Sequence, residues 1–212
     1  DEKVFTIGFA RRAAVYKRPE LLFSDIERLK RIARQIGPLQ IVFGGKAHPR
    51  DFEGKTTIQH VFAAANALKG LVPFVYVENY DLAWGRLLTS GADLWLNTPQ
   101  RPEEASGTSG MKAQINGIPQ LSVLDGWWLE GCIEGITGWS IGPSPEEMLA
   151  EDQRRARELQ DLYSKLRYLV VPMYYNNRDA WVDMMEKSVG KVAYYFNSHR
   201  MMRRYVTEAY IR

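Results

Sequence analysis

Residues 92–116 read ADLWLNTPQRPEEASGTSGMKAQIN, a predicted strand, a glycine-containing loop and a short helix in succession. The apolar run Ala92–Asn97 is typical of a buried strand, and the helix is predicted over Met111–Asn116. Other apolar, β-rich runs occur at residues 4–9, 39–43, 73–77 and 119–124. Helical patterns alternate with these runs, which favours parallel strands joined by right-handed helical crossovers. We therefore expect an α/β fold, a Rossmann-like doubly wound parallel sheet whose ligands bind beyond the carboxyl ends of the strands.

The loop before the predicted helix has a pattern that suits a phosphate. Gly107 and Gly110 allow a close approach of the backbone, and Thr108 or Ser109 can cap the helix. Free amides at a helix N-terminus bind anions. Lys112 follows about one turn later, and its side chain leans back toward that terminus. A ligand with a phosphate and a neighbouring amine-reactive carbonyl, such as pyridoxal phosphate, suits both features, although a similar turn also occurs where nothing binds.

The chain divides into two regions. Residues 1–143 hold all the predicted strands and are expected to form the Rossmann-like domain. Residues 144–212 are expected to form a C-terminal helical segment that packs on the same lobe and on a neighbouring lobe. A capping box with proline at the first helical position, Ser144–Glu147, predicts where this segment begins, and a break is expected near Pro172. The apolar residues expected to pack inward from this segment are Trp181, Met184, Met185, Val189, Val192 and Phe196.

The composition is that of an ordinary globular protein. Its 212 residues are 45% hydrophobic and 25% charged, and the net charge of +3 is too small and too evenly spread to indicate a nucleic acid partner. A single cysteine, Cys132, excludes an internal disulfide and suits a reducing cytoplasm. No apolar run has membrane-spanning length. Of the three histidines only His48 lies in a strand-end loop, and no metal site is predicted.

The loop after the first predicted strand is strongly basic. It reads RRAAVYKR from Arg11 to Arg18, with four cations and no acidic residue. Arginine offers phosphate a planar fork and lysine a point charge, so this density at a strand end calls for an anionic partner. A solvated basic loop is the alternative, and the phosphate-binding helix predicted nearby favours function.

Several motifs, in this order along the chain, resemble those of the α-glucan (glycogen, starch and maltodextrin) phosphorylases. The segment Glu104–Lys112 is similar to their cofactor-lysine motif. The other matches are Lys17 in Tyr16-Lys17-Arg18, Gly45-Lys46-Ala47, Val77-Glu78-Asn79-Tyr80, Asn116-Gly117 and Leu124-Asp125-Gly126. Ser109-Gly110 and Trp127-Trp128 resemble the prokaryotic branch. The resemblance runs from about residue 5 to about residue 142, is weaker across the helical tail, and corresponds to the C-terminal lobe of a two-lobed GT-B glycosyltransferase fold.

The resemblance implies a chemistry. It implies a retaining glucosyl transfer between an α-1,4-glucan end and inorganic phosphate that yields α-glucose 1-phosphate. Lys112 would hold pyridoxal 5'-phosphate covalently, and the phosphate of that cofactor would exchange a proton with the substrate phosphate. Two phosphate dianions in near contact repel each other strongly, and the cations of the first loop would offset this repulsion.

The resemblance also assigns site residues. Those implied to be catalytic are Lys112, Arg12 and Lys17. Those implied to bind substrate are Arg12, Lys17, Glu104, Ala105, Ser106 and Gly107, the two cations for phosphate and the rest for sugar hydroxyls. Those implied to bind the cofactor are Lys112, Thr108, Ser109, Gly110, Arg11 and Tyr80. Two positions depart from the family pattern: Arg11 stands where lysine is usual, and Asp81 where arginine is frequent.

Two alternatives stay open. A nucleotide-sugar-dependent glycosyltransferase lobe has the same architecture and a similar basic pair, but no use for Lys112. A non-catalytic lobe could keep the motif and serve in regulation or assembly. In the phosphorylase interpretation the chain is expected to be a fragment that folds but is inactive alone, because the missing N-terminal lobe of the same polypeptide supplies the rest of the sugar site. A homo-oligomer of the full-length form is compatible with this interpretation.

Overall fold

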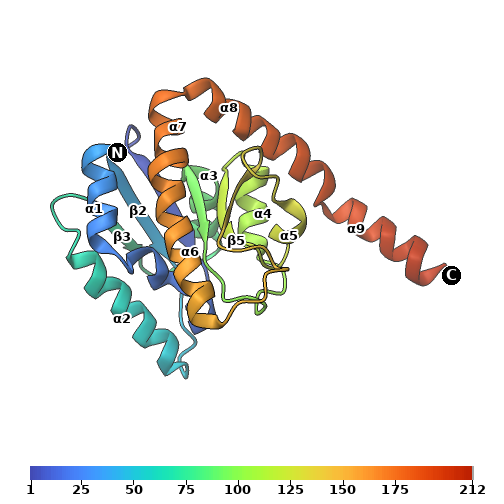
Figure 1. The fold of residues 1–212 in the computed structure, drawn as a ribbon. Helices are drawn as coiled ribbons and strands as arrows, with labels where there is room; N and C mark the ends of the chain where they lie inside the picture. The colour runs from blue at the N-terminus through green and yellow to red at the C-terminus, as the bar shows by residue number, and fades with distance from the viewer. Residues whose placement is uncertain (212) are drawn as a thin grey trace.

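The computed structural model describes residues 1–211. Its centre is a six-stranded parallel sheet in the order β3-β2-β1-β4-β5-β6 (Figure 1). The strands are β1 (Phe5–Ala10), β2 (Leu39–Gly44), β3 (Phe74–Val77), β4 (Leu94–Asn97), β5 (Gln120–Val123) and β6 (Gly138–Ile141). The strand order reverses between β1 and β4, which is the topological switch point of a doubly wound sheet. The predicted fold class is confirmed.

Helices cover both faces of this sheet. The α-helices are α1 (Ile26–Gln35), α2 (Phe52–Asn66), α3 (Leu82–Gly91), α4 (Thr108–Ile115), α5 (Trp128–Gly131), α6 (Glu151–Lys165), α7 (Val171–Asn176), α8 (Arg178–Lys187) and α9 (Ser198–Tyr205). Two 3₁₀ turns, η1 (Val15–Lys17) and η2 (Pro19–Phe23), follow β1. Three π turns extend helices of the tail: η3 (Leu166–Val170), η4 (Ser188–Ala193) and η5 (Val206–Tyr210).

Alternation along the strands divides the core into two layers. Phe5, Ile7 and Phe9 of β1 point to the face covered by α1, α2 and the tail helices α6 to α8. Ala10 and Trp95 point to the opposite face, where α3 and α4 lie. Successive side chains of a strand point to opposite faces, so a sheet buried on both sides needs apolar residues at nearly every position. This explains why the strands appear in the sequence as continuous apolar runs.

The strand β6 and the helix α3 were not predicted from the sequence. The strand β6 has only four residues and begins at Gly138, whose φ of 148° and close approach to Gln120 leave no room for a side chain. Helix α3 contains two glycines, which weaken its helical signal. Asp81 caps this helix, because its carboxylate accepts a hydrogen bond from Trp84 N at 2.9 Å. The departure of position 81 from the family pattern therefore has a local structural role.

The start of the helical tail was predicted wrongly. Ser144–Glu147 forms an isolated turn closed by a hydrogen bond from Glu147 N to Ser144 O at 3.1 Å, and the Glu147 carboxylate accepts a hydrogen bond from Ser144 N at 3.0 Å. Helix α6 begins only at Glu151. The side-chain contact of a capping box is thus present, but the chain does not continue as helix after it.

The expected break near Pro172 is also wrong. The π turn η3 leads directly into α7, with Pro172 in the first turn of α7. A proline clashes with the carbonyl one turn earlier in a regular α-helix, and a π turn relieves this crowding by widening the helix. The break lies instead at Asn177, whose side chain caps α8 by accepting from Ala180 N at 3.1 Å.

The tail packs on the sheet for most of its length and then leaves it. Trp181 and Met184 are buried in the main core, and Trp181 contacts Phe5 and Trp139. Val192 is buried beside Trp127 and Trp128, with Phe196 packed against this cluster, whereas Val189 is exposed. Helix α9 has no buried residue and projects away from the body at the red end of the chain (Figure 1). Within residues 1–211, no helix combines the length and the apolar character needed to cross a membrane.

Candidate functional site

The switch point brings together two loops that lie far apart in the sequence. The loop after β1 carries Arg11 and Lys17, and the loop after β4 carries Glu104. Glu104 Oε2 accepts hydrogen bonds from both Arg11 Nη2 and Lys17 Nζ. The three side chains are between 5% and 9% exposed, so this is a buried cluster of two cations and one carboxylate. It lies beyond the carboxyl ends of the strands, where ligands of such sheets bind.

The electrostatics of the cluster are asymmetric. Burial alone would raise the pKa of Glu104, but the hydrogen bonds and charges of Lys17 and Arg11 outweigh burial and bring that pKa below its ordinary value. Burial lowers the pKa of Arg11, and Glu104 compensates this only in part. Arg11 is the more deeply buried of the two groups, so the loss of hydration outweighs the charge of Glu104 and the weaker influence of Asp125 and Tyr16.

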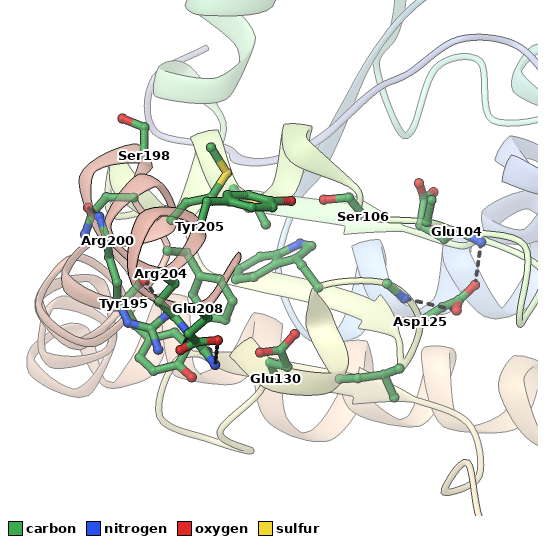
Figure 2. Close-up of a pocket in the computed structure, with 18 of the residues that line it drawn as sticks. Glu104, Ser106, Asp125, Glu130, Tyr195, Ser198, Arg200, Arg204, Tyr205 and Glu208 are labelled. Carbon is green, nitrogen blue, oxygen red and sulfur yellow. Dashed lines mark hydrogen bonds and ion pairs between the residues drawn. The ribbon is translucent and has the colours of Figure 1, made fainter. Parts of the chain in front are cut away.

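Asp125 fixes the backbone of the loop that carries Glu104. Its Oδ2 accepts a hydrogen bond from Glu104 N at 2.9 Å, and its Oδ1 accepts from Gly126 N at 3.0 Å (Figure 2). Burial raises the pKa of Asp125, and the nearby charge of Glu104 adds to the rise. Trp127 N donates to Ser106 O at 2.9 Å, so a second hydrogen bond joins the loop after β5 to the loop after β4. In the sequence Asp125 stands out only as part of the Leu124-Asp125-Gly126 match, because a contact between two loops has no local signal.

The four cations of the first loop have different roles. Arg18 is buried and serves the fold: its guanidinium donates to Thr98 O and Pro99 O at 3.0 and 2.7 Å and pairs with Glu158 at 2.7 Å. Arg12 is exposed, and its contact is a 3.4 Å hydrogen bond to the Tyr16 hydroxyl. The expectation that all four cations call for an external anion is therefore wrong for Arg18, whose anionic partner is internal.

Helix α4 begins earlier than predicted and has a different cap. Its first residue is Thr108, and its N-cap is Gly107, with φ of 90° and no side-chain hydrogen bond to the helix. Neither Thr108 nor Ser109 acts as the cap, because both already lie in the first turn. Arg11 Nη2 lies beside this helix N-terminus, at 3.7 Å from where a Cβ of residue 107 would be, and the positive φ of that residue is what favours glycine there. The first amides of a helix have no intrahelical acceptor, and here they lie beside a cation.

Lys112 is exposed and lines an open pocket of about 560 Å³ between α3 and α4, a volume in the usual range for small-molecule sites. Ser109 and Tyr80, two further residues implied to bind the cofactor, line the same pocket. Arg86 of α3 also lines it, and so provides a cation that position 81 lacks. The residues therefore fit a ligand with a phosphate and an amine-reactive carbonyl, since the pocket combines a primary amine, a hydroxyl and a guanidinium.

Close packing holds α4 in place behind this pocket. A Cβ at Gly110 would come within 1.9 Å of Gln120 Oε1, so any larger residue would have to displace the buried amide of Gln120. Trp95 is fully buried under the helix, and its indole Nε1 donates to Ser109 Oγ at 3.4 Å. Gly110 thus has a packing role in the structure.

A second pocket, of about 910 Å³, adjoins Glu104 (Figure 2). Glu104, Ala105 and Ser106 line one wall of it, and α9 lines the opposite wall. Trp127 forms part of the floor, where it stacks edge-on against Phe196. The residues implied to bind sugar hydroxyls therefore face an open space, with Glu104 at the boundary between this space and the cation cluster.

The remaining candidates contribute little to the site. His48 is exposed, and its Nδ1 accepts a hydrogen bond from Arg50 N at 3.2 Å, a contact within its own loop. Within residues 1–211, no group of three or more His, Cys, Asp or Glu side chains could hold a metal ion. Burial raises the pKa of Cys132 to about 12, so its thiol is unreactive near neutral pH.

The fold and the site define a Rossmann-like lobe with a cationic cluster and a lysine pocket at its switch point. Residues 2–134 match the family of carbohydrate phosphorylases. The maltodextrin phosphorylase of Thermococcus litoralis is 46% identical over 211 residues, and the glycogen phosphorylases of Aquifex aeolicus and Mycobacterium tuberculosis are 41% and 38% identical over 216 residues. The chain belongs to the carbohydrate phosphorylase family.

The matches extend through the helical tail and include 99% of this chain. They include only 25% to 30% of the length of these three relatives. The chain therefore spans between a quarter and a third of a phosphorylase. The relatives are named as phosphorylases, which gives no support to the nucleotide-sugar alternative.

Proposed function

We propose that this chain is the C-terminal catalytic lobe of a pyridoxal-phosphate-dependent α-1,4-glucan phosphorylase, which transfers a glucosyl unit between a glucan end and inorganic phosphate with retention. The observation that carries the proposal is that helix α4 places Lys112 and Ser109 in one pocket with Tyr80, while Arg11 of the cation cluster lies beside Gly107, the N-cap of the same helix. Family membership supports the same assignment.

The residues divide into two binding roles. Lys112 would hold pyridoxal phosphate through its amine, with the first-turn amides of α4 and Arg11 near the phosphate. Arg12 and Lys17 would bind the substrate phosphate, and Glu104 with the backbone of the following three residues would bind sugar hydroxyls. When bound, the cofactor supplies a phosphate group for proton transfer. The cations beside it reduce the repulsion between two phosphates and hold the substrate phosphate in place.

The rest of the phosphorylase is proposed to complete the site. The pocket between Glu104 and α9 is open to solvent, and α9 and the following turn η5 present exposed side chains such as Tyr205 and Tyr210. The N-terminal lobe of the same polypeptide would cover both. We therefore expect the 212-residue chain to turn over no substrate, and phosphorolysis clearly above a protein-free blank would contradict this expectation.

The test of the cofactor site is covalent labelling. The chain is incubated with pyridoxal phosphate, reduced with borohydride and mapped by peptide mass. We expect an adduct on the Lys112 peptide that disappears in Lys112→Ala and persists in Lys69→Ala, which removes an exposed lysine far from the pocket. Labelling of full-length protein that is spread over surface lysines and spares Lys112 would refute the proposal.

A further inference from the structure

Glu104 occupies a position that suits an anion from outside the protein. Its Oε2 bridges Arg11 Nη2 and Lys17 Nζ, two cations that belong to the same loop but are proposed to serve two different phosphates. One internal carboxylate thus uses both cations at once. Because all three side chains are at most 9% exposed, little water can compete with the carboxylate for the two cations.

The cluster still has unused capacity for negative charge. Glu104 is the carboxylate in direct contact with the two cations, and Asp125 acts on Arg11 through space without forming an ion pair with it. Arg11 Nη1 is buried and has no hydrogen-bond partner among the described residues. The lowered pKa of Arg11 has the same origin, since its burial is not fully compensated. A phosphate dianion, with more charge and more acceptor oxygens than a carboxylate, matches this cluster better than Glu104 does.

Glu104 can leave the cluster without refolding of the loop. Asp125 holds its backbone N–H at 2.9 Å, so a movement of the carboxylate needs only side-chain rotation. The residue also lines the open pocket that Ser106 and Trp127 share, which offers the carboxylate space and solvent on its other side (Figure 2). Side-chain rotamers of this kind interconvert readily when a cavity adjoins them.

We propose that Glu104 is an internal competitor for phosphate: its carboxylate holds Arg11 and Lys17 in the ligand-free chain, and phosphate binds when the carboxylate rotates into the neighbouring pocket. This inference rests on the proposed function, which places a substrate phosphate at Lys17 and a sugar in that pocket. Sugar hydroxyls donate to the displaced carboxylate and favour its outward position. Sugar and phosphate therefore raise each other's affinity by the same factor, as linkage requires.

Phosphate titration of the 212-residue chain tests the competition. The dissociation constant of inorganic phosphate is measured by isothermal calorimetry for the wild type, Glu104→Gln and Glu103→Gln. Glu103 is the matched control: it is the adjacent residue, carries the same charge, is exposed and pairs with neither cation. We expect Glu104→Gln to bind phosphate at least about tenfold more tightly, the order of magnitude of one charge-assisted hydrogen bond that no longer competes, and Glu103→Gln to match the wild type.

The alternative role for Glu104 is to hold the two cations in a productive position. In that case Glu104→Gln would bind phosphate as the wild type does or more weakly, and this result overturns the proposal. Equal tightening in Glu103→Gln also overturns it, because it would show a general charge effect. If Glu104→Gln does not fold, Glu104→Asp replaces it. This variant keeps the charge but is too short to bridge both cations, and we expect its phosphate affinity to exceed that of the wild type.

A second titration tests the coupling to sugar. With saturating D-glucose present, the phosphate affinity of the wild type should rise, and that of Glu104→Gln should not. A wild-type affinity that glucose leaves unchanged overturns the coupling. These outcomes are independent of the Lys112 labelling: an adduct without an effect at Glu104 refutes only this inference, whereas a Glu104 effect without an adduct refutes only the proposed cofactor site.

Discussion

Glu158→Gln should destabilise the fold strongly, because it breaks a buried ion pair that joins three elements. Glu158 of α6 is 1% exposed and lies 2.7 Å from Arg18 Nη1. Arg18 in turn donates to the carbonyls of Thr98 and Pro99, at the start of the loop that carries Glu104. The pair therefore connects the helical tail to both loops of the site. Glutamine keeps the size of the side chain and removes only its charge.

The expected loss follows from the environment of the remaining cation. Breaking a buried pair by removing one partner costs about 3–5 kcal/mol, because a charge is left buried without compensation. Two carbonyls continue to accept from Arg18, and the pair with Glu158 is a close ion pair without a well-aligned hydrogen bond at Oε2. We therefore expect the lower end, about 3 kcal/mol, which corresponds to a fall in Tm of roughly 6–12 °C for a chain of this size.

Urea denaturation followed by tryptophan fluorescence measures this loss, since the chain has 6 tryptophans and most are buried. The matched control is Glu147→Gln, which breaks an exposed 3.2 Å pair with Arg157. An exposed pair contributes about 0–1 kcal/mol, so the control should unfold close to the wild-type midpoint. If Glu158→Gln lost less than about 1 kcal/mol, or no more than the control, the reasoning about the buried charge would be refuted.

Three further results are expected. Arg86→Gln should raise the Kd of pyridoxal phosphate about threefold to tenfold, because it removes the cation of the lysine pocket. Absorbance titration measures this Kd, with Arg50→Gln as the control variant. An unchanged Kd would exclude Arg86 from the site. Burial raises the pKa of Cys132 to about 12, so at pH 8 the folded chain should hold about a thousandfold less thiolate than the unfolded chain and react correspondingly slowly with a disulfide reagent. The same shift favours the protonated thiol, so its contribution to stability is complete below pH 9 and is lost as the pH rises toward 12; equally fast reaction of folded and unfolded chains would contradict both statements. Ending the chain at Asn197 should change the free energy of unfolding by less than about 1 kcal/mol, because α9 buries no residue, and a loss above about 2 kcal/mol would show that α9 stabilises this lobe itself.

The sheet could be predicted because its strands are buried on both faces. Five of the six strands appeared as apolar runs within two residues of their observed bounds, since both sides of such a strand need apolar residues. The sixth strand, β6, has four residues and a glycine at a position that a Cβ would fill, so its signal is weak. Helix starts were less predictable. The pattern at Ser144–Glu147 predicts a hydrogen bond between Ser144 N and the Glu147 carboxylate, and this bond forms. No helix follows it directly, because packing decides where a helix begins.

The lysine motif was readable in the sequence because its parts are close neighbours in the chain. A glycine turn, a helix start and Lys112 lie within six residues, so their relative positions follow from helix geometry alone. The structure moved the start of the helix from Met111 to Thr108 and the cap from Thr108 or Ser109 to Gly107. Glycine can adopt the positive φ of that position, which L residues avoid.

The sequence by itself determined the doubly wound architecture, the basic loop and the lysine motif, because periodicity and short spacings depend on local geometry. Only the tertiary structure decided which charges meet. Arg11 and Glu104 are 93 residues apart, and Glu104 could as well have remained a solvated acid at the entrance to α4. The reversal of strand order places β4 beside β1 and brings the two loops together. In that low-dielectric position one carboxylate must serve two cations, and no local pattern in the chain specifies such a pairing.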